Sequence, residues 1–538
     1  MGGSLDRSMW YKKASRPEAL GREIHSSSFF GSLSETHTEM EVLNWILYLC
    51  LSLTIIQALH TIAKRSKSIP KKLPPGPKPF PIIGNLWELG DKPHKSLAKL
   101  AMIHGPLMSL KLGQITTVVI SSATMAKEVL QTHDQLLSNR SIPDAIRAHK
   151  QHELGLPWIP VSSRWRNIRK ICNSQLFAHK ILDANQNLRR KKVQELLADV
   201  HKSCLTNDAV DIGRAAFKTT LNLLSNTICS VDLADPNSDM AREFKELVWN
   251  IMEEVGKPNL ADYFPVLRKV DPQGIRRRMT IYFGNMIELF DSLINKRLLT
   301  RKVPDSIRNI DMLNTLLDIS EESTGEFDKT QIERLFLDLF IAGNDTTSAT
   351  LEWTMAELIH NPEVLSKAKE ELNQIIGKGN PVEESDIARL PYLQAIVKET
   401  FRLHPPVPLL LPRKAEADVE IQGFTVPKGA QVLVNAWAIG RDSSIWENPN
   451  SFKPERFIGS EIDVKGRNFE LIPFGAGRRI CPGLPLAIRM LHLMLGSLIH
   501  TFDWKLEDGF KPEDMSMEDK FGLTLQMAQP LRAIPIMV

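Results

Sequence analysis

Hydrophobic and polar positions along the chain fall into three patterns. The stretch from Asn44 to Ile62 contains no charged residue and is apolar on every face of a helix. From Leu107 to Ser121 the apolar positions alternate around Gly113-Gln114, which predicts a β-hairpin, and strands are also predicted from Val419 to Asn435 and near Leu523 to Met527. Long segments with helical periodicity lie between these regions. We therefore predict a mainly α fold with small β-sheets.

The uncharged stretch predicts a membrane anchor over residues 41–63. About 20 residues rising about 1.5 Å each span the hydrocarbon core of a bilayer. Acidic residues precede the stretch and a basic patch follows it, so the positive-inside rule places the C-terminal bulk in the cytosol. A cleaved signal peptide is the alternative, but the run is longer than a typical signal core and lacks a small-residue cleavage site.

The anchor divides the chain into four predicted parts. Residues 1–40 form an atypical N-terminal extension, serine-rich but too acidic for an organellar transit peptide, and we hypothesise that Met40 is the natural start. Residues 64–79 form a basic and proline-rich hinge, because the run from Leu73 to Pro79 is stiff and cannot be helical. Residues 80–538 contain no low-complexity linker and are predicted to form one catalytic domain.

Composition excludes several functional classes. The net charge of +4 over 538 residues is too small to indicate nucleic-acid binding. Five scattered cysteines form neither a disulfide framework nor a zinc motif. The chain also lacks a Gly-x-Gly-x-x-Gly fingerprint after a strand, so it carries no recognisable flavin or nicotinamide site of its own.

Cys481 is the strongest candidate for chemistry. It lies directly before an apolar helical run, Leu484 to His500, whose N–H groups and dipole favour a thiolate. Gly477 and Gly483 permit close backbone approaches. Arg479 supplies a planar cationic fork suited to a carboxylate. Together these residues predict a thiolate ligand for haem iron with an arginine for a haem propionate, whereas a lone buried cysteine is the alternative.

This segment resembles the signature Phe-x-x-Gly-x-Arg-x-Cys-x-Gly of the cytochrome P-450 haem-thiolate monooxygenases. The resemblance extends over nearly all of the chain from Leu73 to Val538. It implies the cytochrome P-450 fold, haem b as cofactor and Cys481 as the axial ligand of its iron. The signature positions are filled by Phe474, Gly477, Arg479, Cys481 and Gly483.

A second motif lies within a predicted helix. Thr330-Gln-Ile-Glu333 reads as a capping box that opens a helix running to about His360. Its middle, Ala342-Gly-Asn-Asp-Thr-Thr347, is poor helix chemistry, which predicts a local opening that holds water. The alternative is that these hydroxyl groups bond back to their own helix. The family pattern Ala/Gly-Gly-x-Asp/Glu-Thr-Thr/Ser implies that Asp345 and Thr346 deliver protons.

Charged residues elsewhere match further family positions. Glu399 and Arg402 share one helical face, and with Arg456 they match a buried structural triad, although a surface ion pair is the ordinary reading of Glu-x-x-Arg. Trp165 and Arg169 match a Trp-x-x-x-Arg motif that contacts haem propionates. The alternative for their helix is a basic surface that attracts an acidic electron donor. Arg413 is also implied to be a propionate partner.

The narrower resemblance is to plant microsomal members, especially the geraniol 8-hydroxylase-like group. It is carried by residues 409–418, 436–442 and 521–525. It implies hydroxylation of a small hydrophobic metabolite, with a monoterpene alcohol such as geraniol expected and a diterpenoid or a phenolic or flavonoid as alternatives. The expected pocket lining, apolar as such a substrate requires, is Ala342, Thr346, Val407, Leu410 and Phe521.

The resemblance also implies partners and a location. A monooxygenase of this type uses O2 and takes electrons from NADPH through NADPH–cytochrome reductase. It is expected in the endoplasmic reticulum membrane as a single-pass protein, in contact with lipid and with its catalytic domain in the cytosol. Two rival functions are a reductase-independent haem-thiolate isomerase or dehydratase and a haem-based sensor without turnover; intact Asp345 and Thr346 argue against the first.

Overall fold

The computed structural model describes residues 72–538, with the exception of 235–238, 304–310 and 323–326. It also describes five positions near the N-terminus. The chain divides into two compact units, Met1–Ile69 and Pro70–Val538. The predicted extension (1–40) and most of the predicted anchor (41–63) lie outside the described residues. The five described positions of the first unit are residues 44, 45, 48, 49 and 52, all helical and exposed.

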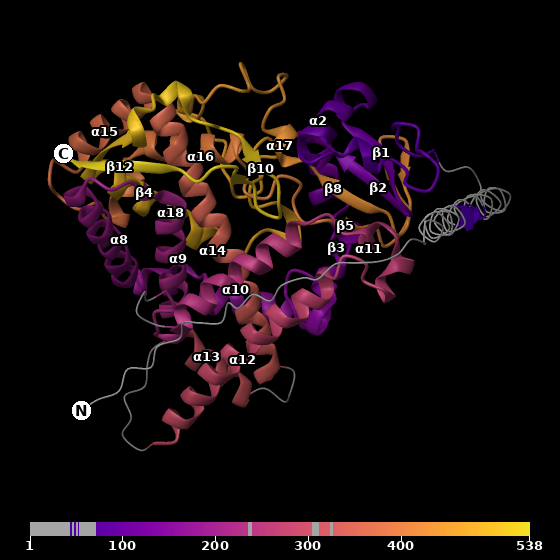
Figure 1. The fold of residues 1–538 in the computed structure, drawn as a ribbon, viewed down its shortest axis with the longest axis horizontal. Coiled ribbons are helices and arrows are strands. Elements are labelled where there is room, and N and C mark those ends of the chain that lie inside the picture. Colours follow the sequence, from indigo (N-terminus) through magenta and orange to yellow (C-terminus); the bar gives the residue numbers. More distant parts are fainter. Residues whose placement is uncertain are drawn as a thin grey trace, which may run out of the picture. The chain divides into compact units, whose positions relative to one another are not determined.

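The second unit is mainly helical with small sheets, as predicted (Figure 1). The short helical turns include η4 (Cys172–Leu176), η5 (Pro265–Lys269), η7 (Pro454–Phe457) and η8 (Gly477–Arg479). The α-helices are α2 (Pro93–His104), α3 (Ala123–Lys127), α4 (Asp134–Leu137), α5 (Gln151–Leu154), α6 (Ser163–Ile171), α7 (His179–Ala184), α8 (Gln186–Thr206), α9 (Ile212–Cys229), α10 (Asp239–Gly256), α11 (Leu260–Tyr263), α12 (Ile275–Arg301), α13 (Met312–Glu322), α14 (Lys329–His360), α15 (Pro362–Ile375), α16 (Pro391–Leu403), α17 (Ala436–Ile439) and α18 (Leu484–Thr501).

The sheets contain the predicted strand regions. The largest has the order β1-β2-β8-β5-β3, in which β1 and β2 form the predicted hairpin around Gly113 and β2 runs parallel to β8. Within the stretch predicted near Leu523 to Met527, only Gln526–Met527 is a strand, so that prediction is right in part. The strands are β1 (Leu107–Leu112), β2 (Ile115–Ile120), β3 (Asn139–Arg140), β4 (Val210–Asp211), β5 (Arg413–Lys414), β6 (Val419–Ile421), β7 (Phe424–Val426), β8 (Gln431–Val434), β9 (Phe502–Leu506), β10 (Asp519–Lys520), β11 (Gln526–Met527) and β12 (Arg532–Met537).

The proline-rich segment after residue 72 lies against the first sheet. Ser109 of β1 donates its backbone N–H to the carbonyl of Pro75 and its hydroxyl to the carbonyl of Pro74. A Cβ on Gly76 would lie 1.8 Å from the Ser109 carbonyl oxygen, so only glycine fits there. This end of the predicted hinge is therefore packed against the body.

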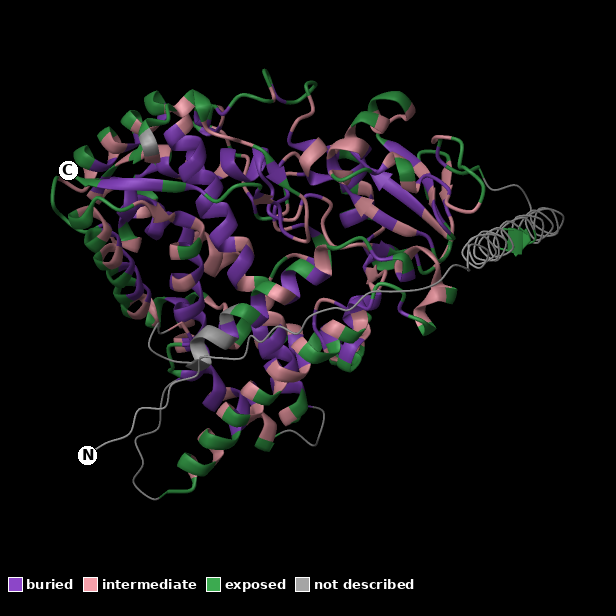
Figure 2. Cartoon of the chain, viewed as in Figure 1, coloured by how far each residue is buried: buried purple, intermediate pink, exposed green. Residues whose placement is uncertain are grey.

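Helix α14 lies in the core of the unit (Figure 2). It packs against α9, α12 and α18, and most of its residues are buried, so it lacks the polar face of a surface helix. Its rings Phe336 and Phe340 contact Phe290 of α12, and Phe340 also contacts Phe244 of α10. Each such fully buried side chain stabilises the fold by about 1.5–3 kcal/mol.

Two details predicted for α14 are wrong. Its N-cap is Asp328, whose carboxylate accepts from the Gln331 N–H at 2.8 Å, and Thr330 already lies inside the helix. The predicted opening at 342–347 is absent, since the helix is continuous from Lys329 to His360. The hydroxyl groups of Thr346 and Thr347 donate to the carbonyls four residues earlier, which satisfies them without breaking the helix.

Other helix boundaries agree with the sequence. α15 begins at Pro362, and α16 begins at Pro391 and ends before Pro405. α18 follows the Cys481 loop as predicted. By length and composition α18 could cross a membrane, but 61% of it is buried inside the protein, so it is a core helix.

Candidate active site

The loop from Phe474 to Gly483 presents Cys481 just before α18. The Cys481 N–H donates to the Phe474 carbonyl at 3.0 Å and closes the loop. Gly477 has φ +69°, and a Cβ there would lie 2.1 Å from the Leu130 carbonyl oxygen. The signature glycine is thus required both by backbone conformation and by a close approach.

The Cys481 thiol is accessible at its surface, yet protein surrounds it closely enough that burial raises its pKa. The N–H groups of Gly483 and Leu484 and the charge of Arg169 act in the opposite direction, as predicted for a helix N-terminus. Burial outweighs them, so the net effect of the surrounding protein is to raise the pKa of the thiol. A bound metal cation deprotonates a coordinating thiol outright.

Four arginines with little compensating negative charge lie around this loop: Arg140, Arg169, Arg413 and Arg479. Among the described residues, their one ion-pair partner is Asp134, which lies 3.2 Å from Arg413. Burial lowers the pKa of Arg479 to about 10 and also lowers that of Arg140, and repulsion between the arginines adds to both shifts. Arg169, whose pKa burial also lowers, donates to no described acceptor. The other acceptors are backbone carbonyls, of Pro157 and Leu411 for Arg140, of Leu137 and Ala476 for Arg413, and of Ser138, Leu156 and Ile159 for Arg479.

Trp165 provides a second mark of an external anion. It is 6% exposed, and its ring N–H has no hydrogen-bond partner among the described residues. The Arg479 guanidinium lies over the ring at 4.9 Å. A buried donor without an acceptor is costly, and so is an excess of buried cations. The two carboxylates of a haem would satisfy both, so the residues present fit this group.

Arg479 itself is already engaged with the protein. Its Nε donates to the Ser138 carbonyl at 3.1 Å and one terminal nitrogen donates to the Leu156 carbonyl at 3.0 Å. It therefore ties the Cys481 loop to the segment before α6, and its contact with a propionate stays a prediction. Sequence reasoning missed Arg140 and Asp134, which belong to no motif and join the cluster only through the tertiary fold.

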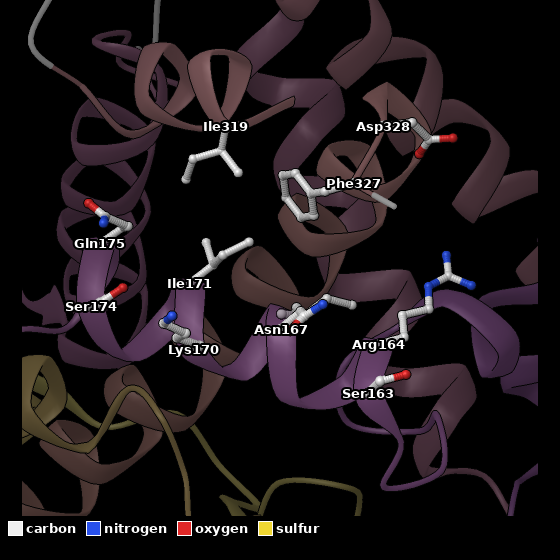
Figure 3. Close-up of a pocket in the computed structure, with 11 residues that line it drawn as sticks. Ser163, Arg164, Asn167, Lys170, Ile171, Ser174, Gln175, Ile319, Phe327 and Asp328 are labelled. Carbon is white, nitrogen blue, oxygen red and sulfur yellow. The ribbon is translucent and has the colours of Figure 1, made fainter. Parts of the chain in front are cut away.

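Helix α6 has two faces with different surroundings. Trp165 and Arg169 lie near Arg479 and Cys481. The opposite face, with Arg164 and Lys170, lines an open groove of about 590 Å³ whose far wall includes Ile319 of α13 and Phe327 (Figure 3). Arg164 donates from this face to the Gln331 side chain at 2.9 Å. The two roles predicted for this helix, contact with haem propionates and attraction of an acidic electron donor, thus concern different faces.

The structure brings Glu399, Arg402 and Arg456 together. Glu399 and Arg402 are 0% and 1% exposed. Two N–H groups of Arg402 donate to the two Glu399 oxygens at 2.7 and 2.8 Å, and Arg456 donates to Glu399 at 3.2 Å. Arg402 also donates to the carbonyls of Gly440 and Ser451. The carboxylate is therefore fully paired, and it holds α16 against η7 and the segment before it.

Asp345 and Thr346 lie in different surroundings. Asp345 is 4% exposed, its Oδ1 accepts from the Gln526 amide at 2.9 Å, and its Oδ2 has no hydrogen-bond partner. Burial raises the pKa of Asp345, while the Thr524 hydroxyl and the Gln526 amide oppose that shift. Thr346 donates to the Ala342 carbonyl at 2.8 Å. Sequence reasoning missed both partners: Thr524 lies within the segment 521–525 that carries the family likeness but was given no role, and Gln526 lies just beyond that segment.

The predicted pocket residues are distributed around these elements. Ala342 is exposed in the middle of the otherwise buried α14, so that face of the helix is not covered by protein. Val407 and Leu410 are half-buried in the turn after α16, where the Leu410 N–H donates to the Val407 carbonyl at 3.1 Å. Phe521, also half-buried, stacks on His94 with ring centroids 5.4 Å apart.

Comparison with known proteins gives consistent matches. The family model described as "Cytochrome P450" matches residues 74–531. The chain is 61% identical over 483 residues to a geraniol 8-hydroxylase of Swertia mussotii, covering 90% of this chain and 96% of that protein. It is 60% identical to a geraniol 8-hydroxylase of Catharanthus roseus, covering 92% and 99%. It is 54% identical to a drimenol monooxygenase of Persicaria hydropiper, covering 91% and 96%.

Proposed function

The chain belongs to the cytochrome P450 family, and from this premise we propose that it is a membrane-anchored monooxygenase that hydroxylates a monoterpene alcohol, with geraniol at its C8 position as the expected substrate. The observation that carries the proposal is the Cys481 thiol beside four arginines that have one carboxylate partner. Haem bound there would supply oxygen activation, with Cys481 as its iron ligand.

The roles of the chain's own residues follow from their geometry. Among the described residues, Trp165 and Arg169 keep side-chain donors that can bind propionates, and Arg413 lies near Arg479, whose pKa its charge lowers. Asp345, whose pKa is raised by burial, can hold a proton near neutral pH better than an exposed aspartate. Thr346 on the next position of α14 presents a hydroxyl that can exchange its bond to Ala342 for one to water.

The substrate class rests on the relatives and on the apolar lining. Two relatives act on geraniol and one on drimenol by their names, and both names denote terpenoid alcohols. Ala342, Val407 and Leu410 would offer such a molecule apolar contacts. The test is to express residues 40–538 with reductase in microsomes and to compare terpene alcohols, diterpenoids and phenolics by product mass. A hydroxylated geraniol supports the proposal, and turnover of phenolics alone contradicts the substrate assignment.

We further propose NADPH–cytochrome reductase as electron donor and the endoplasmic reticulum membrane as location. Exposed Arg166 and Lys170 on α6 suit an acidic donor. Trp45 and Tyr48, helical and 73% and 67% exposed, suit a lipid environment in the first unit. NADPH dependence of product formation distinguishes this function from that of a reductase-independent isomerase.

Two substitutions test the chemistry. Cys481→Ser is expected to abolish the reduced carbon monoxide spectrum and turnover, and retention of both contradicts the proposal. Thr346→Ala is expected to keep haem but divert NADPH consumption to hydrogen peroxide, whereas Thr346→Ser keeps the hydroxyl and serves as the control. Unchanged coupling in Thr346→Ala contradicts the proton-delivery role.

A further inference from the structure

We propose that Gln526 is the positioning residue for Asp345: its amide fixes the orientation of the carboxyl group and thereby selects the oxygen that carries the proton. This inference rests on the proposed monooxygenase function. The Gln526 amide nitrogen lies 2.9 Å from Oδ1 of Asp345, and Oδ2 has no hydrogen-bond partner. The N–H bond favours Oδ1 as the carbonyl oxygen, so the proton of a neutral Asp345 is expected on Oδ2.

Gln526 can act in this way because its backbone is held in place. The residue before it, Leu525, accepts the ring N–H of Trp353 at 2.9 Å and donates its own N–H to the Pro406 carbonyl at 2.9 Å. Trp353 lies on α14 two turns after Asp345 and stacks on His404 with ring centroids 3.9 Å apart. The strand that carries Gln526 is thus tied to the same helix that carries Asp345.

The far strand of the hairpin is anchored as well. β10 pairs antiparallel with β11, and its Asp519 lies 2.8 Å from the Lys95 ammonium and 3.3 Å from His94, both on α2. His94 is fully buried and packs against Trp437. These contacts fix the hairpin at both strands, so the Gln526 side chain meets Asp345 from a rigid support.

Asp345 has few other polar neighbours that could do the same. The Thr524 hydroxyl lies close enough to lower its pKa, but it makes no well-formed bond, since both that hydroxyl and Oδ2 lack a partner. Asn344, the preceding residue, is turned away and accepts from Thr220 of α9. Gln526 is therefore the one described residue that forms a hydrogen bond to the Asp345 side chain.

The first test compares holoenzyme variants in microsomes with reductase, by the ratio of product to NADPH consumed. Gln526→Leu removes the donor, so the ratio is expected to fall several-fold and its decline at high pH to shift upward by about one pH unit, because the lost bond had favoured ionised Asp345. In Gln526→Glu the new carboxyl can donate when protonated, so coupling is expected to be retained at low pH and lost at high pH.

A matched control is available on the same rung of the hairpin. Lys520 pairs with Gln526 across β10 and β11 and is exposed. Lys520→Ala is expected to leave the ratio and its pH dependence unchanged. An unchanged ratio and pH profile in Gln526→Leu overturns the proposal, and so does an equal loss in Gln526→Glu at every pH, since that outcome indicates a structural role.

A double-mutant cycle separates this inference from the proposed function. In the Asp345→Asn background, Gln526→Leu is expected to lower the product ratio no further, and a full additional loss overturns the proposal. The same four proteins are compared by the thermal unfolding midpoint of the holoenzyme. Non-additive shifts of the midpoint support the contact between Gln526 and Asp345. If no terpenoid is hydroxylated but the shifts are non-additive, the substrate assignment alone fails. Additive shifts overturn the proposed contact.

Discussion

Two groups of buried and half-buried arginines in this protein differ in how many carboxylates compensate their charge. In the α16 group, Arg402 and Arg456 share the Glu399 carboxylate, and each also donates to backbone carbonyls. Around the Cys481 loop, four arginines have one ion-pair partner within the part of the chain that the structure describes, Asp134. The first group has two arginines for one carboxylate, whereas the second has four arginines for one carboxylate and thus a larger excess of positive charge.

This difference separates scaffold from ligand site. A buried ion pair with all its bonds made needs nothing from outside, and removing one member strands the other. A buried cation without a partner keeps a desolvation penalty until an anion arrives. The lowered pKa values of Arg169, Arg413 and Arg479 express that penalty. The arginines near Cys481 are therefore arranged for an anionic ligand and those on α16 for the fold.

The largest effect is expected from removing the carboxylate of the α16 group. Glu399→Ala would leave Arg402, which is 1% exposed, without its carboxylate, and the expected loss is about 3–5 kcal/mol of stability. We expect aggregate or protein without haem. The measurement is the yield of soluble protein together with the reduced carbon monoxide spectrum.

The control for this prediction lies on the neighbouring turn. Glu455 of η7 makes an exposed salt bridge with Lys367, so Glu455→Ala is expected to change stability by about 1 kcal/mol or less. A well-folded holoenzyme from Glu399→Ala would show that the carboxylate is not needed and that the comparison is mistaken.

The sequence predicted the α16 group better than the four arginines around the Cys481 loop. Glu399 and Arg402 are three residues apart on one helix, so their meeting follows from helical spacing alone. The Cys481 loop likewise carries its constraints locally, in glycines and in the start of α18. Arg140 meets the other arginines only through the pairing of β3 with β5, and no local pattern announces a strand of two residues.

The surroundings of Asp345 and Thr346 on α14 were also only partly predictable from the sequence. The sequence identified Asp345 and Thr346 but predicted an opening in α14, because it weighed their poor helix propensity and could not weigh tertiary burial. The partner of Asp345, Gln526, lies 181 positions further along the chain. Contacts of that separation depend on how α14 and the β10–β11 hairpin pack, which periodicity does not encode.

Glu352, a buried carboxyl group, tests whether an uncompensated negative charge carries the same penalty as the uncompensated arginines. Glu352 of α14 is 8% exposed and accepts from the Leu531 N–H at 3.0 Å, but it has no cationic partner among the described residues, and burial raises its pKa to about 7. Its folded pKa exceeds the unfolded value, so its stabilising contribution is complete below about pH 4.5 and is lost as pH rises to about 7. Relative to Glu352→Gln, the wild type should lose about 3 kcal/mol across this window.

The measurement is the thermal midpoint of both proteins from pH 5 to 8. Glutamine keeps the acceptor for Leu531 but cannot ionise, so the two curves should diverge as pH rises, with the variant more stable at pH 8. Glu461→Gln, at an exposed position, should follow the wild type. Parallel curves for Glu352→Gln would mean that this acid is ionised without penalty and that charge balance is a poor guide in this core.

The smallest and most specific effect is expected from Arg169, which donates to no described acceptor and whose charge also lowers the pKa of Cys481. Arg169→Leu removes one cation of the excess, so folding should be unaffected while haem affinity falls about 10–100-fold, the equivalent of one charge-assisted hydrogen bond. Haem transfer to an excess of a competing apoprotein measures this. Arg166→Leu, an exposed arginine on the same helix, is the matched control and should retain haem as the wild type does. If Arg169→Leu instead lowers the yield of soluble protein as Glu399→Ala does, while the folded fraction keeps the haem affinity of the wild type, both groups of arginines serve the scaffold and the distinction between them fails.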